Sequence, residues 1–330
     1  MIAVTVEDSS QVSEARREAT DIARRRGYDD ADAGRVALVA TELATNLIKH
    51  GGGGELLVGS FDNGVSNGLE LLALDKGPGM ANVAACLTDG YSSAGTPGRG
   101  LGAVVRQSHF VDIASWPGVG TAVLVHITTG QSKTPTPSSS GNAWGAVSVP
   151  MRGERVCGDG WSVSNEAIGR TLLVADGLGH GPDAAEAAVE AIRLFKRFGG
   201  HHVPTLLDHV HGGLRSTRGA AVSIARFDAA AKKIIFSGIG NVAGVLVMNG
   251  QLRRMVSMAG TAGHVARKIQ AFDYPFERGM VILHSDGLQT SWTLDRYSGL
   301  EAFHPTLIAG VLYRDLTRHR DDATVLVAKW

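Results

Sequence analysis

The spacing of apolar residues in the first third of the chain predicts helices followed by strands. Apolar residues recur at helical intervals between residues 12 and 23, and Gly27 ends that pattern. A second apolar stripe predicts a helix that starts at a cap on Asp30 or Asp32 and runs to about His50. Short apolar runs then predict strands at residues 55–59, 69–74, 110–115 and 121–127. This mixture of elements predicts an α+β sandwich.

Strands dominate the pattern beyond residue 142. Short β-rich runs predict strands at residues 146–149, 171–175, 220–227, 234–237, 244–247, 281–284 and 324–328. Asn249-Gly250 between two apolar stretches favours a hairpin. Helical spacing occurs at residues 184–198, about 203–214 and near 305–316. Many antiparallel strands with helices on the outside predict a second layered sandwich.

The segment between the two patterns, residues 129–142, has the composition of a linker. It contains Pro, Ser, Thr and Gly but lacks the apolar residues that a packed element needs. A chain of 330 residues is long enough for two domains at about 100–200 residues each. We therefore expect one domain over residues 1–128 and another over residues 143–330.

Composition narrows the functional classes. Lys and Arg number 32 and Asp and Glu also number 32, which argues against a nucleic-acid-binding protein because such proteins carry a basic excess. No apolar run reaches transmembrane length, and the acidic N-terminal stretch does not resemble a secretory signal. Cys86 and Cys157 fit neither a zinc site nor a disulfide scaffold. We expect a cytoplasmic protein that does not bind membranes.

Two short motifs in the first domain carry chemistry. Glu42 and Asn46 are one helical turn apart, so they share a face on which a carboxylate and an amide can hold a hydroxyl group and Mg²⁺. Asp75 follows a predicted strand and can accept a hydrogen bond from an exocyclic amine, while Gly77 and Gly79 let the backbone approach a flat ring. Taken separately, the first pair is also compatible with a solvated helix surface, and the second with an ordinary Pro-Gly turn.

A glycine-rich loop, Gly95–Gly102, leads into a helix from about residue 103. Backbone amides at the start of a helix can bind an anion. The loop lacks the Lys-Ser/Thr pair of a Walker loop and the spacing of a dinucleotide fingerprint. By itself it is weak evidence.

Taken in this order, the three pieces resemble the Bergerat ATP-binding fold of the GHKL superfamily. The Asn-box matches Glu42–Asn46, the adenine box matches Asp75–Gly79, and the lid matches Gly98–Gly102. Residues 87–95 resemble RsbT-like anti-sigma-factor serine kinases in particular. The resemblance implies ATP and Mg²⁺ as cofactors, with Glu42 as the catalytic residue acting on the accepting hydroxyl. The ATP-binding residues that it implies are Asn46, which also binds magnesium, Asp75, Gly77, Gly79, Gly98, Gly100, Gly102 and Thr121.

The second domain offers acidic motifs at four separate strand edges. They contain Asp159, Asp176, Asp286 and the pair Asp321-Asp322. A single Asp-Gly motif is commonly a turn. Four carboxylates that converged would repel each other unless cations held them, and hard oxygen ligands suit Mg²⁺ or Mn²⁺. Two such ions at about 3.5–4 Å can direct water onto a phosphate ester.

These motifs resemble the RsbX/SpoIIE-like branch of the metal-dependent Ser/Thr phosphatases, which have an α-β-β-α sandwich fold. The resemblance is strongest at Asp176–Gly181, whose sequence is Asp-Gly-Leu-Gly-His-Gly. It implies two Mn²⁺ or Mg²⁺ ions held by Asp159, Asp176, the Gly177 carbonyl, Asp286 and Asp321. Asp322 is an alternative to Asp321. His180 is a possible proton donor to the leaving oxygen, with a packing role in the turn as the alternative.

The leading hypothesis is a bifunctional partner-switching regulator. An ATP-dependent Ser/Thr kinase and a metal-dependent phosphatase would act on a STAS-domain antagonist, with a sigma factor or a downstream phosphatase as a further partner. One alternative is an ATP-binding module that sequesters a sigma factor or STAS protein without transferring phosphate. Another is a phosphatase that is the only active half and is regulated by nucleotide.

Overall fold

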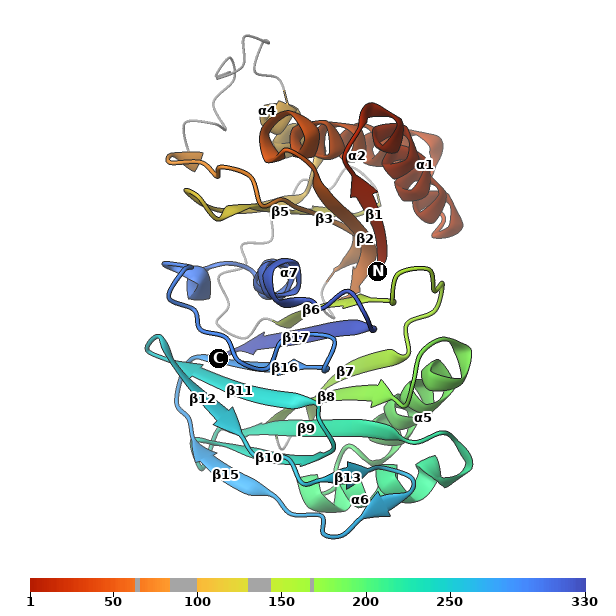
Figure 1. The fold of residues 1–330 in the computed structure, drawn as a ribbon, viewed down its shortest axis with the longest axis vertical. Coiled ribbons are helices and arrows are strands. Elements are labelled where there is room, and N and C mark those ends of the chain that lie inside the picture. The colour runs from red at the N-terminus through yellow and green to blue at the C-terminus, as the bar shows by residue number, and fades with distance from the viewer. Residues whose placement is uncertain (63–65, 84–99, 130–143, 167–168) are drawn as a thin grey trace. The chain divides into compact units, whose positions relative to one another are not determined.

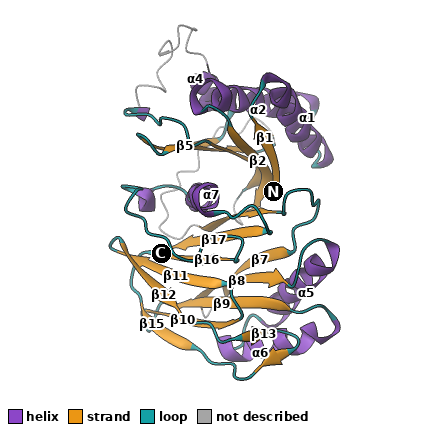
Figure 2. Ribbon diagram, viewed as in Figure 1, coloured by secondary structure: helices purple, strands orange, loops and turns teal. Residues whose placement is uncertain are grey.

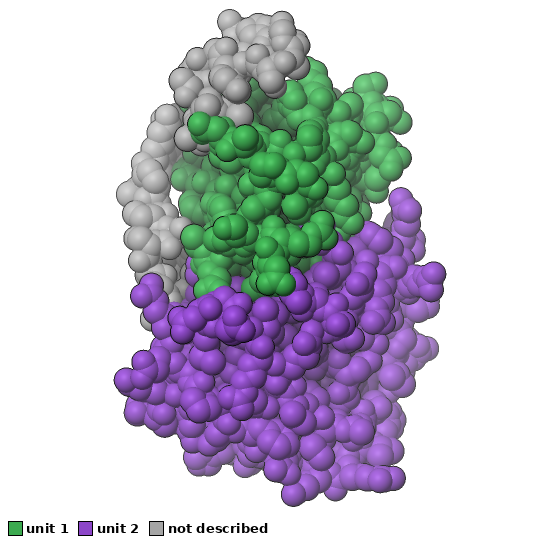
Figure 3. All heavy atoms as spheres, turned by 60° about the vertical axis from the view of Figure 1, so that its left-hand side comes forward, with its two compact units in different colours: residues 1–140, 294–314 green, residues 141–293, 315–330 purple. Residues whose placement is uncertain are grey.

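The computed structural model describes residues 1–62, 66–83, 100–129, 144–166 and 169–330. The chain divides into two compact units, coloured separately in Figure 3. Unit 1 contains Met1–Ser140 together with Leu294–Arg314, and unit 2 contains Gly141–Thr293 together with Asp315–Trp330. Apart from its first residue, the predicted linker lies outside the described residues. The predicted domain boundary at the linker did not include residues 294–314 in the first unit, where the structure places them.

Unit 1 is built on a five-stranded antiparallel sheet with strand order β1-β2-β3-β5-β4. The strands are β1 (Ile2–Val6), β2 (Gly54–Asp62), β3 (Asn67–Leu74), β4 (Phe110–Trp116) and β5 (Gly120–Ile127). The last four confirm the predicted runs. Strand β1 was not predicted, because its five residues are too few for a clear alternating pattern.

Three helices cover one face of this sheet: α1 (Ser9–Arg25), α2 (Asp30–Gly51) and α4 (Gly100–Gln107) (Figures 1 and 2). Asp8 caps α1 in a capping box with Gln11. The N-cap of α2 is Asp29, whose side chain accepts a hydrogen bond from the Asp32 N–H. The predicted caps, Asp30 and Asp32, were therefore wrong by one and three residues. The apolar stripes of α1 and α2 meet alternate residues of the strands in one buried cluster.

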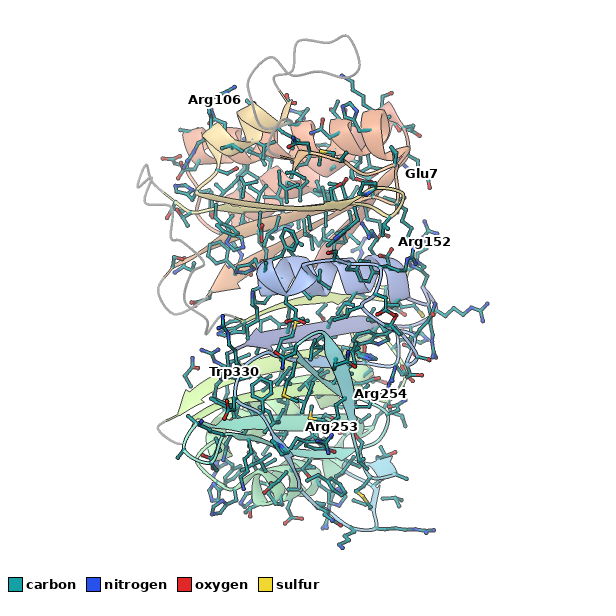
Figure 4. All side chains as sticks on the ribbon, turned by 90° about the vertical axis from the view of Figure 1, so that its left-hand side faces the viewer. Glu7, Arg106, Arg152, Arg253, Arg254 and Trp330 are labelled. Atoms are coloured by element: carbon teal, nitrogen blue, oxygen red, sulfur yellow. The ribbon has the colours of Figure 1, made fainter. Side chains whose placement is uncertain are left out.

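The other face of the sheet is covered by the segment from the second half of the chain (Figure 4). This segment holds a short 3₁₀ helix, η2 (Leu300–Ala302), and most of α7 (Pro305–Leu316). Residues 305–314 of α7 are all buried. A helix that is apolar and buried all round is packed on more than one side.

Two stacked sheets form unit 2, with strand orders β15-β10-β9-β8-β7 and β12-β11-β16-β17-β6. The first contains β7 (Asp159–Glu166), β8 (Gly169–Gly177), β9 (Ala220–Asp228), β10 (Lys233–Ile239) and β15 (Phe272–Pro275). The second contains β6 (Trp144–Val149), β11 (Ala243–Met248), β12 (Gln251–Met255), β16 (Met280–His284) and β17 (Ala323–Lys329). A two-stranded ribbon joins β13 (Gly260–Thr261) to β14 (Val265–Ala266).

The predicted hairpin at Asn249-Gly250 is confirmed as the turn between β11 and β12. Strand β7 was missed, although its Trp161 and Val163 alternate with polar residues as a half-buried strand requires.

One core of unit 2 lies between its two sheets and another between the first sheet and helices α5 (Pro182–Phe198) and α6 (Val203–Gly213). A 3₁₀ turn, η1 (Leu214–Ser216), follows α6. At the end of β17, Trp330 packs its ring near those of Phe227 and Phe276. Among the described helices, none combines the length and apolar character needed to cross a membrane.

Candidate functional sites

Helix α2 and the start of α4 bring the first group of predicted residues together. A methyl group on Gly100 would lie 3.3 Å from Glu42 Oε2 and 3.3 Å from Asn46 Oδ1. Glu42 and Asn46 therefore face the beginning of the predicted lid, where Gly102 is buried in α4. The Asn46 Nδ2 atom is buried and has no hydrogen-bond partner among the described residues. Such a group is expected to be satisfied by a ligand or solvent.

The predicted adenine-binding loop packs against the end of α2. Asp75 follows β3, and its Oδ1 accepts hydrogen bonds from the Gly77 N–H at 2.8 Å and the Thr121 N–H at 3.1 Å. Both bonds go to the same oxygen, which leaves Oδ2 to accept from a bound amine. A methyl group on Gly77 would stand 2.7 Å from Gly51 Cα. The glycine thus permits the close approach of the loop to the helix that carries Glu42.

Burial raises the pKa of Asp75, and the two backbone N–H donors oppose that rise. Thr121 reaches Asp75 through its backbone, while its hydroxyl lies 2.9 Å from Ser115 Oγ. Gly79 has φ +71°, and a methyl group there would overlap the Trp116 carbonyl at 2.2 Å. Only glycine fits this turn without strain. Gly98 and residues 87–95 lie outside the described residues.

In unit 2, Asp159 and Asp176 are direct cross-strand partners on β7 and β8. Like charges placed opposite each other in an antiparallel pair destabilise the sheet. Burial raises the pKa of both groups, and repulsion from neighbouring carboxylates raises it further. The Asp159 Oδ2 atom is buried without a hydrogen-bond partner in the described part of the chain. A divalent cation would offset the repulsion between the carboxylates and would also give the buried Asp159 oxygen a partner.

Asp286 and Asp321 complete the acidic group. Asp286 follows β16, and its Oδ2 accepts from Asn241 Nδ2 at 2.6 Å. Burial raises the pKa of Asp286, and repulsion by Asp321 adds to the rise. The four carboxylates therefore act on one another electrostatically. Within the described ranges, however, no group of three or more His, Cys, Asp or Glu side chains converges closely enough to hold a metal ion by itself.

The neighbouring Asp322 has a different environment. Its Oδ1 accepts from the Met151 N–H at 2.7 Å, and its Oδ2 accepts from the Gly158 N–H at 2.9 Å. Both oxygens are thus used to hold the chain that leads into Asp159. This favours Asp321 over Asp322 as the metal ligand.

Sequence reasoning missed three side chains around the loop after Asp176. His180 Nδ1 lies 2.8 Å from Glu154 Oε1, and the His180 side chain is 52% exposed. Arg218 pairs with Asp183, and its Nη1 lies 3.4 Å from the position of a methyl group on Gly179. No sequence motif includes Glu154, Asp183 or Arg218, so their proximity to the loop is visible only in the folded structure.

Unit 2 is expected to lose stability with rising pH when divalent ions are removed. Burial, followed by repulsion from Asp159, raises the pKa of Asp176 to about 9. A raised carboxyl pKa contributes stability at low pH that is lost as pH rises through the folded-state value. His284, whose pKa is lowered by burial, opposes this trend only weakly above pH ~6.5, because at most about half of the unfolded-state imidazole is still protonated there.

Thermal melts in EDTA should therefore show the transition of unit 2 falling by about 5 °C between pH ~6.5 and ~9. Mn²⁺ should raise the transition, and by more at the higher pH, because metal binding displaces protons. A melting temperature in EDTA that rises over the same interval would contradict this assignment of the carboxylates.

Comparison with known proteins defines the first half. Residues 5–127 match the family described as histidine kinase-like ATPase domains. This segment is similar to histidine kinase-like ATPase domains. The chain is also 29% identical over 109 residues to the serine/threonine-protein kinase RsbT of Bacillus subtilis strain 168, covering 33% of this chain and 82% of RsbT. The predicted RsbT-like GHKL resemblance is confirmed.

Solved structures define the fold of the second half. A chain of the bacterial stressosome, a modular system adapted to control secondary messenger signalling, is 25% identical with a TM-score of 0.53, covering 57% of this chain and 98% of that chain. The PP2C phosphatase domain of SpoIIE from Bacillus subtilis, with a fragment of its regulatory domain, is 16% identical with a TM-score of 0.50, covering 97% and 92%. The C-terminal part of this chain has the PP2C-like phosphatase fold, which confirms the predicted fold class.

Together the comparisons describe an ATPase-like domain joined to a PP2C-like fold. The donor sets in this chain suit a magnesium-nucleotide in the first and divalent cations in the second. The orphaned Asn46 amide fits a magnesium-nucleotide, and the buried, mutually repelling carboxylates of unit 2 fit hard cations.

Proposed function

We propose that this chain is a bifunctional partner-switching regulator that phosphorylates a serine or threonine of a STAS-domain protein and also removes that phosphate. The proposal is carried by the presence, in one chain, of an ATPase domain related to a serine/threonine kinase and a PP2C-like fold in which Asp159 and Asp176 are directly opposed on neighbouring strands. The stressosome relative supports a STAS-domain substrate.

In the ATPase domain, Glu42 accepts the proton of the attacking hydroxyl and aligns it with the γ-phosphate. Asn46 would hold the magnesium ion, and Asp75 would accept a hydrogen bond from the adenine amine. The absence of a side chain would let the backbone approach the nucleotide at five glycines: Gly77, Gly79, Gly98, Gly100 and Gly102. Phosphoryl transfer depends mainly on positioning and charge neutralisation, so a small set of groups suffices. The closeness of Gly100 to Glu42 and Asn46 supports this assignment.

In the phosphatase half, two Mn²⁺ or Mg²⁺ ions would be held by Asp159, Asp176, Asp286, Asp321 and the Gly177 carbonyl. Such ions would supply neutralisation of the phosphate charge and activation of water. Asn241 orients Asp286 through its 2.6 Å hydrogen bond, and Asp322 positions Asp159 through the Gly158 backbone. His180, oriented by Glu154, donates a proton to the leaving oxygen.

The competing function is an ATP-binding module that captures its partner without phosphorylating it. Label transfer separates the two. The full chain carrying Asp176→Asn, which disables the proposed phosphatase, is incubated with Mg²⁺ and γ-labelled ATP in the presence of a bacterial STAS-domain anti-anti-sigma protein. The proposed kinase places label on a serine or threonine of that protein, and Glu42→Ala abolishes the transfer. Stable complex formation with no label on the STAS protein would establish the capture module instead.

A further inference from the structure

The first observation concerns the second face of the ATPase-domain sheet. Residues of β3 alternate, and Leu71 and Ala73 belong to the cluster under α1 and α2. Leu72 and Leu74 therefore point to the opposite face, yet they are just as buried. A methyl group on Gly310 of α7 would lie 2.4 Å from Leu72 Cδ2. Helix α7 thus packs closely on this face.

The chain leading into α7 is fixed to the same sheet. The Trp116 Nε1–H donates to the Ser298 carbonyl at 2.9 Å, and the Trp116 ring lies edge-on to the ring of Tyr297. The His304 N–H donates to Asp112 Oδ2 at 2.7 Å. These directed contacts make the docking of residues 294–304 specific, because each requires a particular partner on β4.

Arg314 of α7 reaches the nucleotide-binding residues themselves. Its side chain is buried, and Nη1 donates to the Asp75 carbonyl at 2.8 Å and to the Thr121 carbonyl at 3.3 Å. A methyl group on Gly120 would lie 2.9 Å from the same Nη1. Arg314 therefore fixes the backbone of the two residues whose mutual hydrogen bond shapes the adenine site.

The far end of α7 is tied to a different loop. The Gln289 N–H donates to the Leu316 carbonyl at 2.9 Å, and the Arg318 N–H donates to the Gly287 carbonyl at 2.8 Å. Gly287 directly follows Asp286, and Arg318 is three residues before Asp321. Only one residue of α7, Asp315, separates Arg314 from Leu316.

We infer that Arg314 is a positioning residue for the nucleotide and that α7 couples nucleotide binding to the phosphatase site. The inference rests on the proposed function of both sites. A nucleotide that stabilises the Asp75 and Thr121 backbone also stabilises α7, and the last residue of α7 and Arg318 just after it hold the loop that carries Asp286. Coupling of this kind is reciprocal and typically changes affinity or population about 5- to 150-fold.

ADP is the appropriate probe, since it occupies the nucleotide site without supplying a phosphoryl group for transfer. Binding of ADP to the full chain is measured by calorimetry, and hydrogen exchange is measured with and without ADP. Activity toward p-nitrophenyl phosphate is measured at a fixed concentration of free Mn²⁺. In the wild-type chain, ADP should slow amide exchange at residues 286–289 and 314–318 and raise phosphatase activity about fivefold or more.

Arg314→Ala should weaken ADP binding about tenfold and bring the ratio of activities with and without saturating ADP close to one. The variant should keep the wild-type far-UV circular dichroism spectrum and a cooperative thermal transition, which a general loss of structure would not allow. Arg314→Lys, which retains a donor, should recover part of the ratio. Arg193→Ala removes an exposed arginine of α5 that pairs with Glu190, and it should change none of these quantities.

Amide hydrogen exchange in the wild-type chain tests the inference even if the variants fold poorly. ADP binding with no change in exchange at these residues and no change in phosphatase activity would overturn the coupling while leaving the proposed kinase intact. Failure of the wild-type chain to bind ADP would overturn both.

Discussion

Asp176→Asn is expected to lower phosphatase activity by at least about a hundredfold, since loss of an outer-shell metal partner alone costs about 10- to 100-fold. Asp176 lies opposite Asp159 on the neighbouring strand and is repelled by the carboxylates of Asp159, Asp286 and Asp321. It therefore interacts electrostatically with every other member of the acidic group. Hydrolysis of p-nitrophenyl phosphate in Mn²⁺ measures the loss.

The same substitution is expected to stabilise the protein in EDTA near pH ~9, where ionised Asp176 would add a repelling charge to a buried site, and to change stability little near pH ~6.5. The Mn²⁺-induced rise in melting temperature should disappear. Asp273→Asn is a matched control, since it removes an exposed carboxylate of β15 that pairs with Lys233. Asp176→Asn protein with a preserved Mn²⁺ shift and near-normal turnover would show that the metals are held elsewhere.

Glu42→Gln is expected to reduce phosphoryl transfer about 10²- to 10⁴-fold, the usual contribution of a general base. The amide keeps the size of the side chain beside Gly100 but cannot accept the hydroxyl proton. ADP affinity should remain within about twofold, because the proposed nucleotide-binding residues are Asp75 and Asn46 and do not include Glu42. Transfer of label from ATP to the STAS protein and calorimetry with ADP provide the two measurements.

Glu14→Gln, on the exposed face of α1, is the matched control for this change. Equal loss of ADP binding and of transfer in Glu42→Gln would assign Glu42 to nucleotide binding. Undiminished transfer would remove it from the mechanism.

The local pattern was sufficient where one element or one motif carries the information. The apolar stripe of α2 predicts a helix that places Glu42 and Asn46 on one face, and the structure has both residues beside Gly100. Asp75 was predicted at the end of a strand, and it follows β3 directly. These features depend on residues close together in the sequence.

Long-range features were beyond the reach of the pattern. The Asp-Gly sequence at Asp159 indicates a turn, and this obscured the alternation of Trp161 and Val163 in β7. Without β7, the direct opposition of Asp159 and Asp176 was not foreseen. Helix α7 was predicted, but its periodicity does not say which sheet it covers. The hydrogen bond from Arg314 to Asp75 joins residues 239 positions apart.

Phosphate release from ATP tests the central claim most directly. Kinase and phosphatase acting on one substrate would convert ATP and water to ADP and inorganic phosphate through a phosphorylated STAS protein. The wild-type chain with Mg²⁺, Mn²⁺ and the STAS protein should release phosphate over many turnovers. Asp176→Asn should phosphorylate each STAS molecule once and release no phosphate. Glu42→Gln should neither phosphorylate the STAS protein nor release phosphate. A mixture of the two variants should restore release. Phosphate release that does not depend on the STAS protein, or that survives both substitutions, would contradict a bifunctional regulator.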